Sequence, residues 1–305
     1  MSANLRHSPD LSPDQHNTSM NIQIISDKLE KFFNEVATIQ HYQRLSDDAA
    51  KRFVSELHMR EQSLKNLDTD SQEAFGTSVH VFSFYNPYTG TLHPYSHNKI
   101  TNQEKARLVY LQKNKQYQWL LVEAYELFED FIVWIYDHIR GEHPEFRLTK
   151  DSTTTEIPLI ELKKKIPQII DNFRKKLKNL KNIEIENKTN TNLRLHLCMI
   201  EKFRHVIVHK NGITGDPDSL VDDILKRANL ASDKAREPLA REAICHYMGI
   251  DDYKGWIVLV EQSIFNYGGM SMNINRHENL VNSLLAYALV LSRSLVSQVM
   301  PSQPN

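Results

Sequence analysis

The sequence predicts a mainly α-helical protein whose long helices form an antiparallel bundle. Only nine glycines and eleven prolines occur among its 305 residues, and a low content of helix-breaking residues favours helices. Four segments space their apolar residues at the helical period, namely residues 101–140, 156–181, 191–211 and 276–299. Amphipathic helices of this length bury their apolar stripes against one another, so we expect these four to pack as one bundle.

The first hundred residues are predicted to form an N-terminal extension of this bundle. Residues 1–20 are polar and aperiodic, which is typical of a disordered tail. Residues 21–68 contain two amphipathic pieces and are expected to fold as a helical hairpin. The alternating run from Val79 to Tyr85 precedes the turn signal Asn86-Pro87-Tyr88-Thr89-Gly90. This pattern favours a small β-hairpin near residues 78–95 or an ordered loop.

The predicted bundle helices have recognisable starts and one break. Thr101 and Glu104 have the spacing of a capping box at the start of the first helix. Pro167 is expected to kink the second helix, because proline lacks a backbone N–H and its ring clashes with the preceding turn. Asn190 or Thr191 is the expected N-terminal cap of the third helix.

Between the third and fourth helices the pattern is less regular. Residues 213–255 contain one predicted short helix at about 218–228, and residues 256–272 could be strand or helix. The predicted organisation is therefore a tail (1–20), an N-terminal helical extension with the loop or hairpin (21–100), and a helical bundle (101–299) with an insert (213–275).

Composition limits the class of protein. The chain has 37 basic and 38 acidic residues, so any nucleic-acid surface has to be local. Its two cysteines, Cys198 and Cys245, lie in helical patterns, which argues against a disulfide scaffold. With no apolar signal core and no run of 18 apolar residues, the sequence favours a soluble cytoplasmic protein.

The strongest functional signal is the stretch 204–212, which reads Arg-His-Val-Ile-Val-His-Lys-Asn-Gly. Arginine–histidine pairs with similar spacing occur three times, at Arg52 and His58, Arg204 and His209, and Arg241 and His246. Only Arg204 is followed by a histidine, a β-branched apolar spacer and a helix stop at Asn211-Gly212. The middle pair is therefore the candidate functional motif.

This stretch resembles the signature of the HEPN superfamily (higher eukaryotes and prokaryotes nucleotide-binding): an arginine, usually followed by Asn, Asp or His, then an apolar spacer and a histidine. The resemblance covers the four long helices and implies an antiparallel bundle of HEPN type. It also implies a metal-independent endoribonuclease that works as a homodimer without a cofactor, in defence or as a toxin-like effector. The first hundred residues and the insert 213–275 lie outside it.

The residue types suit metal-free RNA cleavage. Histidine can accept or donate a proton near neutral pH, and arginine can bind phosphate oxygens. The catalytic candidates are therefore Arg204, His205 and His209. Because Arg204 and His209 lie about 140° apart on an ideal helix, their convergence requires a distorted last turn or a partner chain. Relatives often place an acidic side chain near the arginine, and Glu129 is our choice among Glu123, Glu126 and Glu129, although an ordinary solvated acidic face is equally compatible with the pattern.

A basic segment is the candidate RNA-binding surface. Residues 163–181 contain eight basic residues and one acidic residue, Asp171. Basic side chains bind RNA phosphates, and the residues predicted to do so are Lys163, Lys164, Lys165, Arg174, Lys175, Lys176, Lys178 and Lys210. A solvated lysine-rich helix face explains the same pattern.

Other interpretations of the motif remain open. Arg204, His205 and His209 could form a cationic helix end, and Glu201, His205 and His209 have a spacing that suits zinc ligands on one helix. The chain could also be a non-catalytic RNA- or protein-binding relative. The expected partners are RNA, a second copy of the chain and an antitoxin or other regulatory protein.

Overall fold

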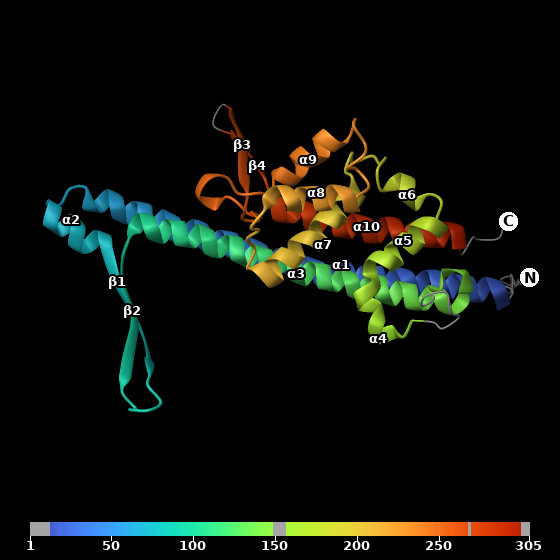
Figure 1. Cartoon of the computed structure of the whole chain (residues 1–305), viewed down its shortest axis with the longest axis horizontal. Coiled ribbons are helices and arrows are strands. Elements are labelled where there is room, and N and C mark those ends of the chain that lie inside the picture. Colours follow the sequence, from blue (N-terminus) through green and yellow to red (C-terminus); the bar gives the residue numbers. More distant parts are fainter. Residues whose placement is uncertain (1–12, 149–156, 268–269, 300–305) are drawn as a thin grey trace, which may run out of the picture. The chain divides into compact units, whose positions relative to one another are not determined.

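The computed structural model describes residues 13–148, 157–267 and 270–299, and it is mainly helical with two short antiparallel hairpins in this part of the chain (Figure 1). The chain divides into two compact units. One comprises Met1–Ile39 with Leu121–Asn305, and the other Gln40–Leu120. Helices α1 (Pro13–Leu64) and α3 (Asn102–Glu142) each contribute to both units.

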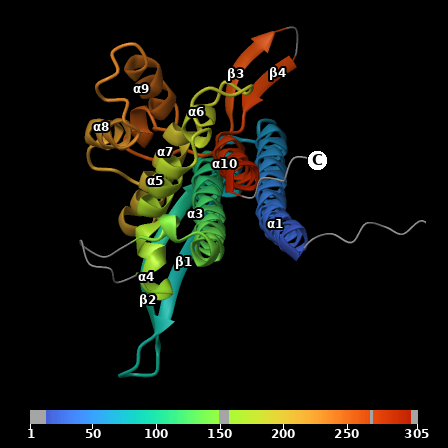
Figure 2. The same ribbon diagram turned by 90° about the vertical axis from the view of Figure 1, so that its right-hand side faces the viewer.

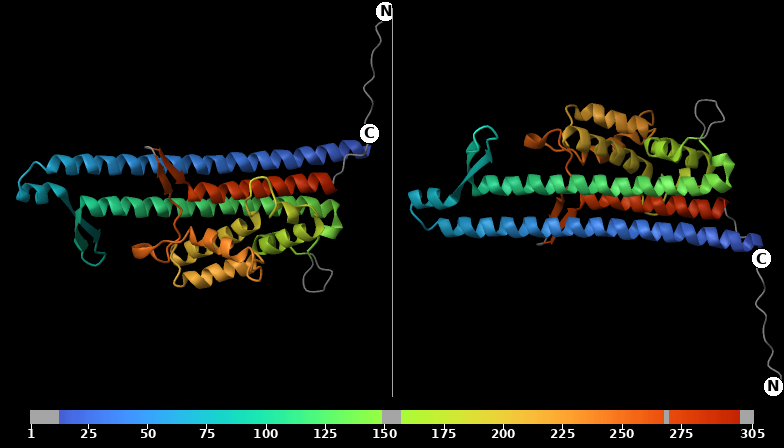
Figure 3. Two further views of the ribbon diagram at one scale, coloured as in Figure 1. Left: turned by 90° about the horizontal axis from the view of Figure 1, so that it is seen from above. Right: turned by 90° about the horizontal axis from the view of Figure 1, so that it is seen from below.

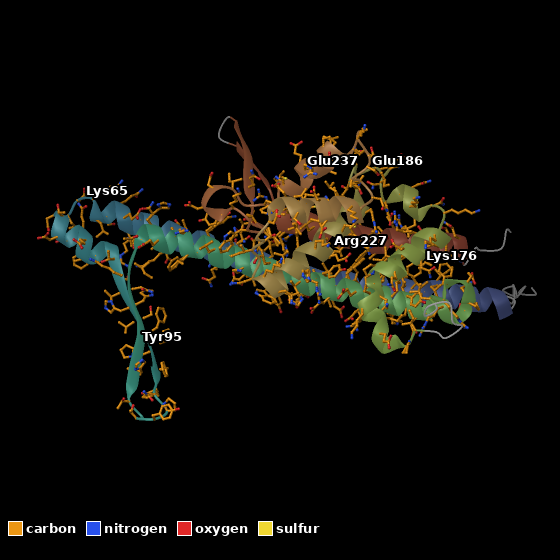
Figure 4. All side chains as sticks on the ribbon, in the orientation of Figure 1. Lys65, Tyr95, Lys176, Glu186, Arg227 and Glu237 are labelled. Carbon is orange, nitrogen blue, oxygen red and sulfur yellow. The ribbon has the colours of Figure 1, made fainter. Side chains whose placement is uncertain are left out.

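The smaller unit carries the first hairpin. Helix α2 (Thr69–Gly76) leads into strands β1 (Thr77–Tyr85) and β2 (Leu92–Thr101), which pair antiparallel. The predicted hairpin is thus confirmed and extends beyond residues 78–95. Its turn contains Gly90 at φ +68°. Side chains of the hairpin, including Tyr95, extend away from its ribbon (Figure 4).

The predicted helical hairpin at 21–68 is wrong, because α1 continues without a break from Pro13 to Leu64. Where the two amphipathic pieces meet, Asp47 forms two ion pairs: it lies 2.6 Å from both Lys51, one turn later, and Lys113 of α3. Of the predicted tail, residues 13–20 belong to α1, and residues 1–12 lie outside the described part. At the start of α3 the capping box is confirmed, with Thr101 N donating to Glu104 at 2.7 Å and Glu104 N donating to Thr101 Oγ1 at 3.2 Å.

The larger unit is built around aromatic packing between long helices. In it the first part of α1, the last part of α3 and α10 (Arg276–Val299) run side by side (Figures 2 and 3). The ring of Phe32 stacks on Phe131 at 5.2 Å, and Phe128 meets Tyr287 edge-on at 5.9 Å. Such pairs add about 0.5–1.5 kcal/mol each to the burial of their area.

Helix α10 is also the one described helix long and apolar enough to cross a membrane, with a mean hydropathy of 1.5 over 18 residues. More than half of that window (56%) is buried inside the protein. Core helices of soluble proteins have this same property.

The expected helix at 156–181 is broken into pieces. It consists of α4 (Leu159–Leu162), the 3₁₀ turn η2 (Lys163–Lys165), α5 (Ile166–Lys176) and α6 (Leu180–Ile183). Pro167 lies in the first turn of α5 instead of kinking a continuous helix. Proline is tolerated at this position because an N–H in the first turn would have no acceptor within the helix, so its absence costs no hydrogen bond. Residue 156 lies outside the described part of the chain.

The motif helix α7 (Leu193–Lys210) matches its predicted span, but its N-cap is Asn192, not Asn190 or Thr191. The Asn192 side chain accepts from Leu195 N at 2.9 Å. The insert that follows contains α8 (Pro217–Arg227), as predicted, and also α9 (Glu237–Cys245), the 3₁₀ turn η3 (Asp251–Tyr253) and the hairpin β3–β4 (Gln262–Tyr267 and Met270–Ile274). Residues 256–260 join neither a helix nor a named strand, although Trp256 and Ile257 form isolated bridges with Ile213 and Met248.

The two cysteines lie in different environments. Cys198 is buried within α7, and burial raises the pKa of its thiol to about 11. Cys245, at the end of α9, is exposed. Both are free thiols.

A buried carboxylate links several elements of the larger unit. Glu184, just after α6, is fully buried, and its carboxylate accepts hydrogen bonds from Arg174 of α5 at 2.7 Å and from the Tyr287 hydroxyl of α10 at 2.6 Å. Its backbone oxygen accepts from Leu193 N at the start of α7 at 2.8 Å. One residue therefore fixes α5, α7 and α10 relative to one another.

We predict that Glu184→Gln destabilises the protein by about 3–5 kcal/mol, because it leaves the part-buried Arg174 guanidinium without its closest carboxylate. Urea unfolding followed by circular dichroism measures this loss. Glu186→Gln, two residues away on an exposed side chain (Figure 4), is the matched control and should change stability by less than about 0.5 kcal/mol. Equal effects of the two substitutions would contradict the role given to Glu184.

We also predict that acid destabilises the protein through the part-buried His196 and the fully buried His277. Burial lowers the pKa of His196, whose Nδ1 lies 2.6 Å from Ser283 Oγ, and that of His277 to about 4. Both titrate near 6.5 when unfolded, so the unfolded chain binds more protons below that pH. Each histidine should therefore remove about 1.4 kcal/mol of stability per pH unit as pH falls from 6.5 towards 4. Unfolding free energies measured across this range test it, and His196→Asn should flatten the slope.

Candidate functional site

Arg204 lies on α7 against the acidic side of α3. Its Nη2 atom is 3.4 Å from Glu126 Oε1, with the two side chains 32% and 56% exposed. Its Nε atom is buried and has no hydrogen-bond partner among the described residues. The guanidinium is thus only partly neutralised, and one of its N–H groups is left for another acceptor.

Glu129, the predicted acidic partner, lies one turn further along α3 and is half-buried. Burial raises the pKa of its carboxyl to about 7, the nearby charge of Arg204 lowers it, and Glu126 raises it. Of the three candidate glutamates, Glu126 makes the direct ion pair with Arg204, and Glu129 is the one whose carboxyl titrates near neutral pH. Glu123 is exposed.

His205 and His209 lie on the exposed side of α7. Their ring centroids are 4.7 Å apart with the planes inclined at 52°. The pKa of His205 is lowered, first by partial burial and then by the neighbouring charges of His209, Lys210, Lys202 and Arg204. One histidine of the pair is therefore held towards its neutral form, in which it can accept a proton.

The last turn of α7 is distorted. Asn211 is left-handed at φ +56°, and the N–H groups of Asn211 and Gly212 both donate to the carbonyl of Val206. These bonds span five and six residues, so the helix end is wider than a regular α-turn. Arg204 still faces Glu126 while His209 faces His205. In a single chain the arginine and the second histidine thus have separate neighbours.

The zinc alternative finds no support in the described residues, which contain no group of three His, Cys, Asp or Glu side chains able to hold a metal ion. Glu201, the third member of that spacing, lies 3.8 Å from Arg227 Nε instead.

The residues of the basic segment are divided among η2, α5 and the loop that follows α5. Lys163 pairs with Asp130, and Arg174 is occupied by Glu184 and Asp171. The remaining predicted phosphate ligands Lys164, Lys175, Lys176, Lys178 and Lys210 are exposed, and Lys165 is half-buried.

A basic pocket of about 840 Å³ lies among α5, α6, α7 and α8, and sequence reasoning missed most of it. Besides Arg174 its cations are Lys175, Lys181, Arg194, Lys202, Lys226 and Arg227. They come from four separate segments, so no local run of sequence reveals them. The pocket and the histidine pair share the helix α7, which carries Lys202 as well as His205 and His209. The charge of Lys202 contributes to the lowered pKa of His205.

Comparison of the chain with protein-family models, with curated proteins and with solved structures gives no match. The functional assignment therefore depends on the residues of the site.

We predict that Arg204→Gln raises the pKa of Glu129 above about 7, because it removes a positive charge that lowers this pKa. Glu126→Gln should have the opposite effect, since the Glu126 charge raises the same pKa. Carboxyl ¹³C chemical shifts followed against pH measure both changes. A titration of Glu129 near 4.5 in the unmodified protein, or shifts of the same sign in both variants, would contradict this electrostatic coupling.

Proposed function

We propose that this chain is a metal-independent endoribonuclease of HEPN type, with Arg204, His205, His209 and Glu129 at its catalytic site. The observation that carries the proposal is the cluster on α7 and α3: a half-buried arginine with an unpartnered Nε beside a carboxyl of pKa about 7, and an adjacent pair of exposed histidines. The resemblance of residues 204–212 to the HEPN signature supports the same assignment.

The chemistry assigns a role to each group. Cleavage requires removal of the 2′-hydroxyl proton, stabilisation of a pentacoordinate phosphorane and protonation of the 5′-oxygen. Neutral His205 suits the base, because partial burial and then the nearby charges lower its pKa. His209 supplies the acid, and Arg204 binds the phosphate oxygens as negative charge develops. Glu126 pairs with Arg204 and orients it, and Glu129, whose pKa is raised to about 7, exchanges a proton near neutral pH.

The proposed enzyme is a homodimer. In a single chain Arg204 contacts Glu126 and His209 contacts His205, so the two do not meet on one phosphate. A second copy would bring the arginine of one chain and the histidine of the other to the same substrate. RNA is the proposed substrate, a cytoplasmic toxin-like or defence effector is the proposed role, and an antitoxin or other regulatory protein is a proposed partner.

Incubation of the full chain with transfer RNA or single-stranded RNA in excess EDTA tests the function. We expect cleavage, reduced about 10²–10⁴-fold in His209→Ala and about 10²–10³-fold in Arg204→Ala. His58→Ala, which replaces an exposed histidine of the other unit, is the matched control and should keep full activity. Undiminished cleavage by both site variants would refute the assignment.

A second candidate function is RNA binding without cleavage, which the exposed lysines and the part-exposed guanidinium of Arg204 support. RNA that remains intact, together with affinity that weakens in Arg204→Ala, is the expected result under this alternative.

A further inference from the structure

The basic pocket among α5, α6, α7 and α8 lies outside the proposed catalytic cluster. Asp171 lines this pocket and is shared by three arginines: Arg194 at 3.2 Å, Arg174 at 3.4 Å and Arg227 at 3.8 Å. A single carboxylate cannot neutralise three guanidinium groups. Glu184 and Glu201 provide further acceptors for Arg174 and Arg227.

Three lysines that line the pocket make no ion pair among the described residues. These are Lys175, Lys181 and Lys226, all exposed, whereas Lys202 pairs with Asp223 at 3.1 Å. Together the seven basic side chains exceed the four acidic groups that line the pocket or pair with its arginines by three charges. The pocket is thus a concentrated positive site in a chain of net charge −1.

Helix ends explain only part of this concentration. Arg174, Lys175, Lys226 and Arg227 lie in the last turns of α5 and α8, where cations offset the negative end of the helix dipole. Arg194 is different, because it lies in the first turn of α7, where the dipole disfavours a cation.

Arg194 is also nearly buried, with 4% of its surface exposed, and its Nε atom has no hydrogen-bond partner among the described residues. Burial of a guanidinium with an unpaired N–H is costly. An anion in the pocket would supply the missing acceptor and would offset the excess positive charge.

We propose that this pocket binds a chain of two or three linked phosphate groups. The three arginines around Asp171 and the three unpaired lysines offer more donors than one phosphate can accept, and the excess of three positive charges matches a di- or triphosphate. The volume of about 840 Å³ falls in the range of ligand pockets. The linked phosphates come either from a free oligophosphate or from the 5′-triphosphate end of an RNA. This binding does not depend on the proposed cleavage.

Isothermal titration calorimetry of the full chain with tripolyphosphate, in EDTA and low salt, tests the proposal. We expect one saturable site, with sulfate and inorganic phosphate at least tenfold weaker. The double substitution Lys175→Gln with Lys226→Gln should weaken tripolyphosphate binding at least tenfold, and circular dichroism should remain unchanged because both lysines are exposed and unpaired. Lys65→Gln, an exposed lysine outside the pocket (Figure 4), is the matched control.

A second arm distinguishes the two sources of linked phosphates, using a short RNA with either a 5′-triphosphate or a 5′-hydroxyl. Preference for the triphosphate RNA, lost in the double variant, assigns the RNA end; tripolyphosphate binding without that preference assigns a free oligophosphate. No binding of tripolyphosphate, equally tight binding of sulfate, or equal loss in Lys65→Gln would overturn the proposal. RNA cleavage by the same variants is scored separately, so failure of the pocket and failure of the nuclease are distinguishable.

Discussion

The carboxylate of Glu184 is fully buried, and elements far apart in the sequence meet on it. Arg174 of α5 and Tyr287 of α10 donate to its side chain, and the first residue of α7 donates to its backbone oxygen. A buried charge with good partners gives little net stability, but its geometric demands are strict. The carboxylate thereby joins α5 and α10, and the backbone carbonyl of the same residue receives the first N–H of the motif helix α7.

The same helix then joins two electrostatic environments. Arg194 and Lys202 of α7 line the basic pocket, and Arg204 faces the acidic side of α3. The pKa of the half-buried Glu129 is about 7 because burial, together with the neighbouring acidic charges, outweighs the charge of Arg204. Movement of α7 relative to α3 would change that balance directly.

Local patterns predicted the features that depend on local residues. The spans of α3, α7 and α10, the capping box at Thr101 and the β1–β2 hairpin follow from periodicity, caps and turn residues. The sequence predicted a break in α1 that the structure does not contain. In the middle of this helix Asp47 pairs with Lys113, a contact between distant segments that no local pattern reveals. Which glutamate pairs with Arg204 depends on how α3 packs against α7. The basic pocket likewise forms only where four separate segments meet in space. The sequence motif located Arg204, but tertiary structure determines its neighbours.

The contrast between the two thiols has a practical consequence. Thiol reagents attack the thiolate, so Cys198, buried with its pKa near 11, is unreactive while the chain is folded, whereas Cys245 is accessible. A maleimide dye would therefore modify the native protein at one position, the end of α9. A second equivalent would be consumed only when α7 leaves the core. The chain can therefore be labelled at Cys245 without a substitution. The rate at which Cys198 is then modified reports how often the helix that carries the motif opens.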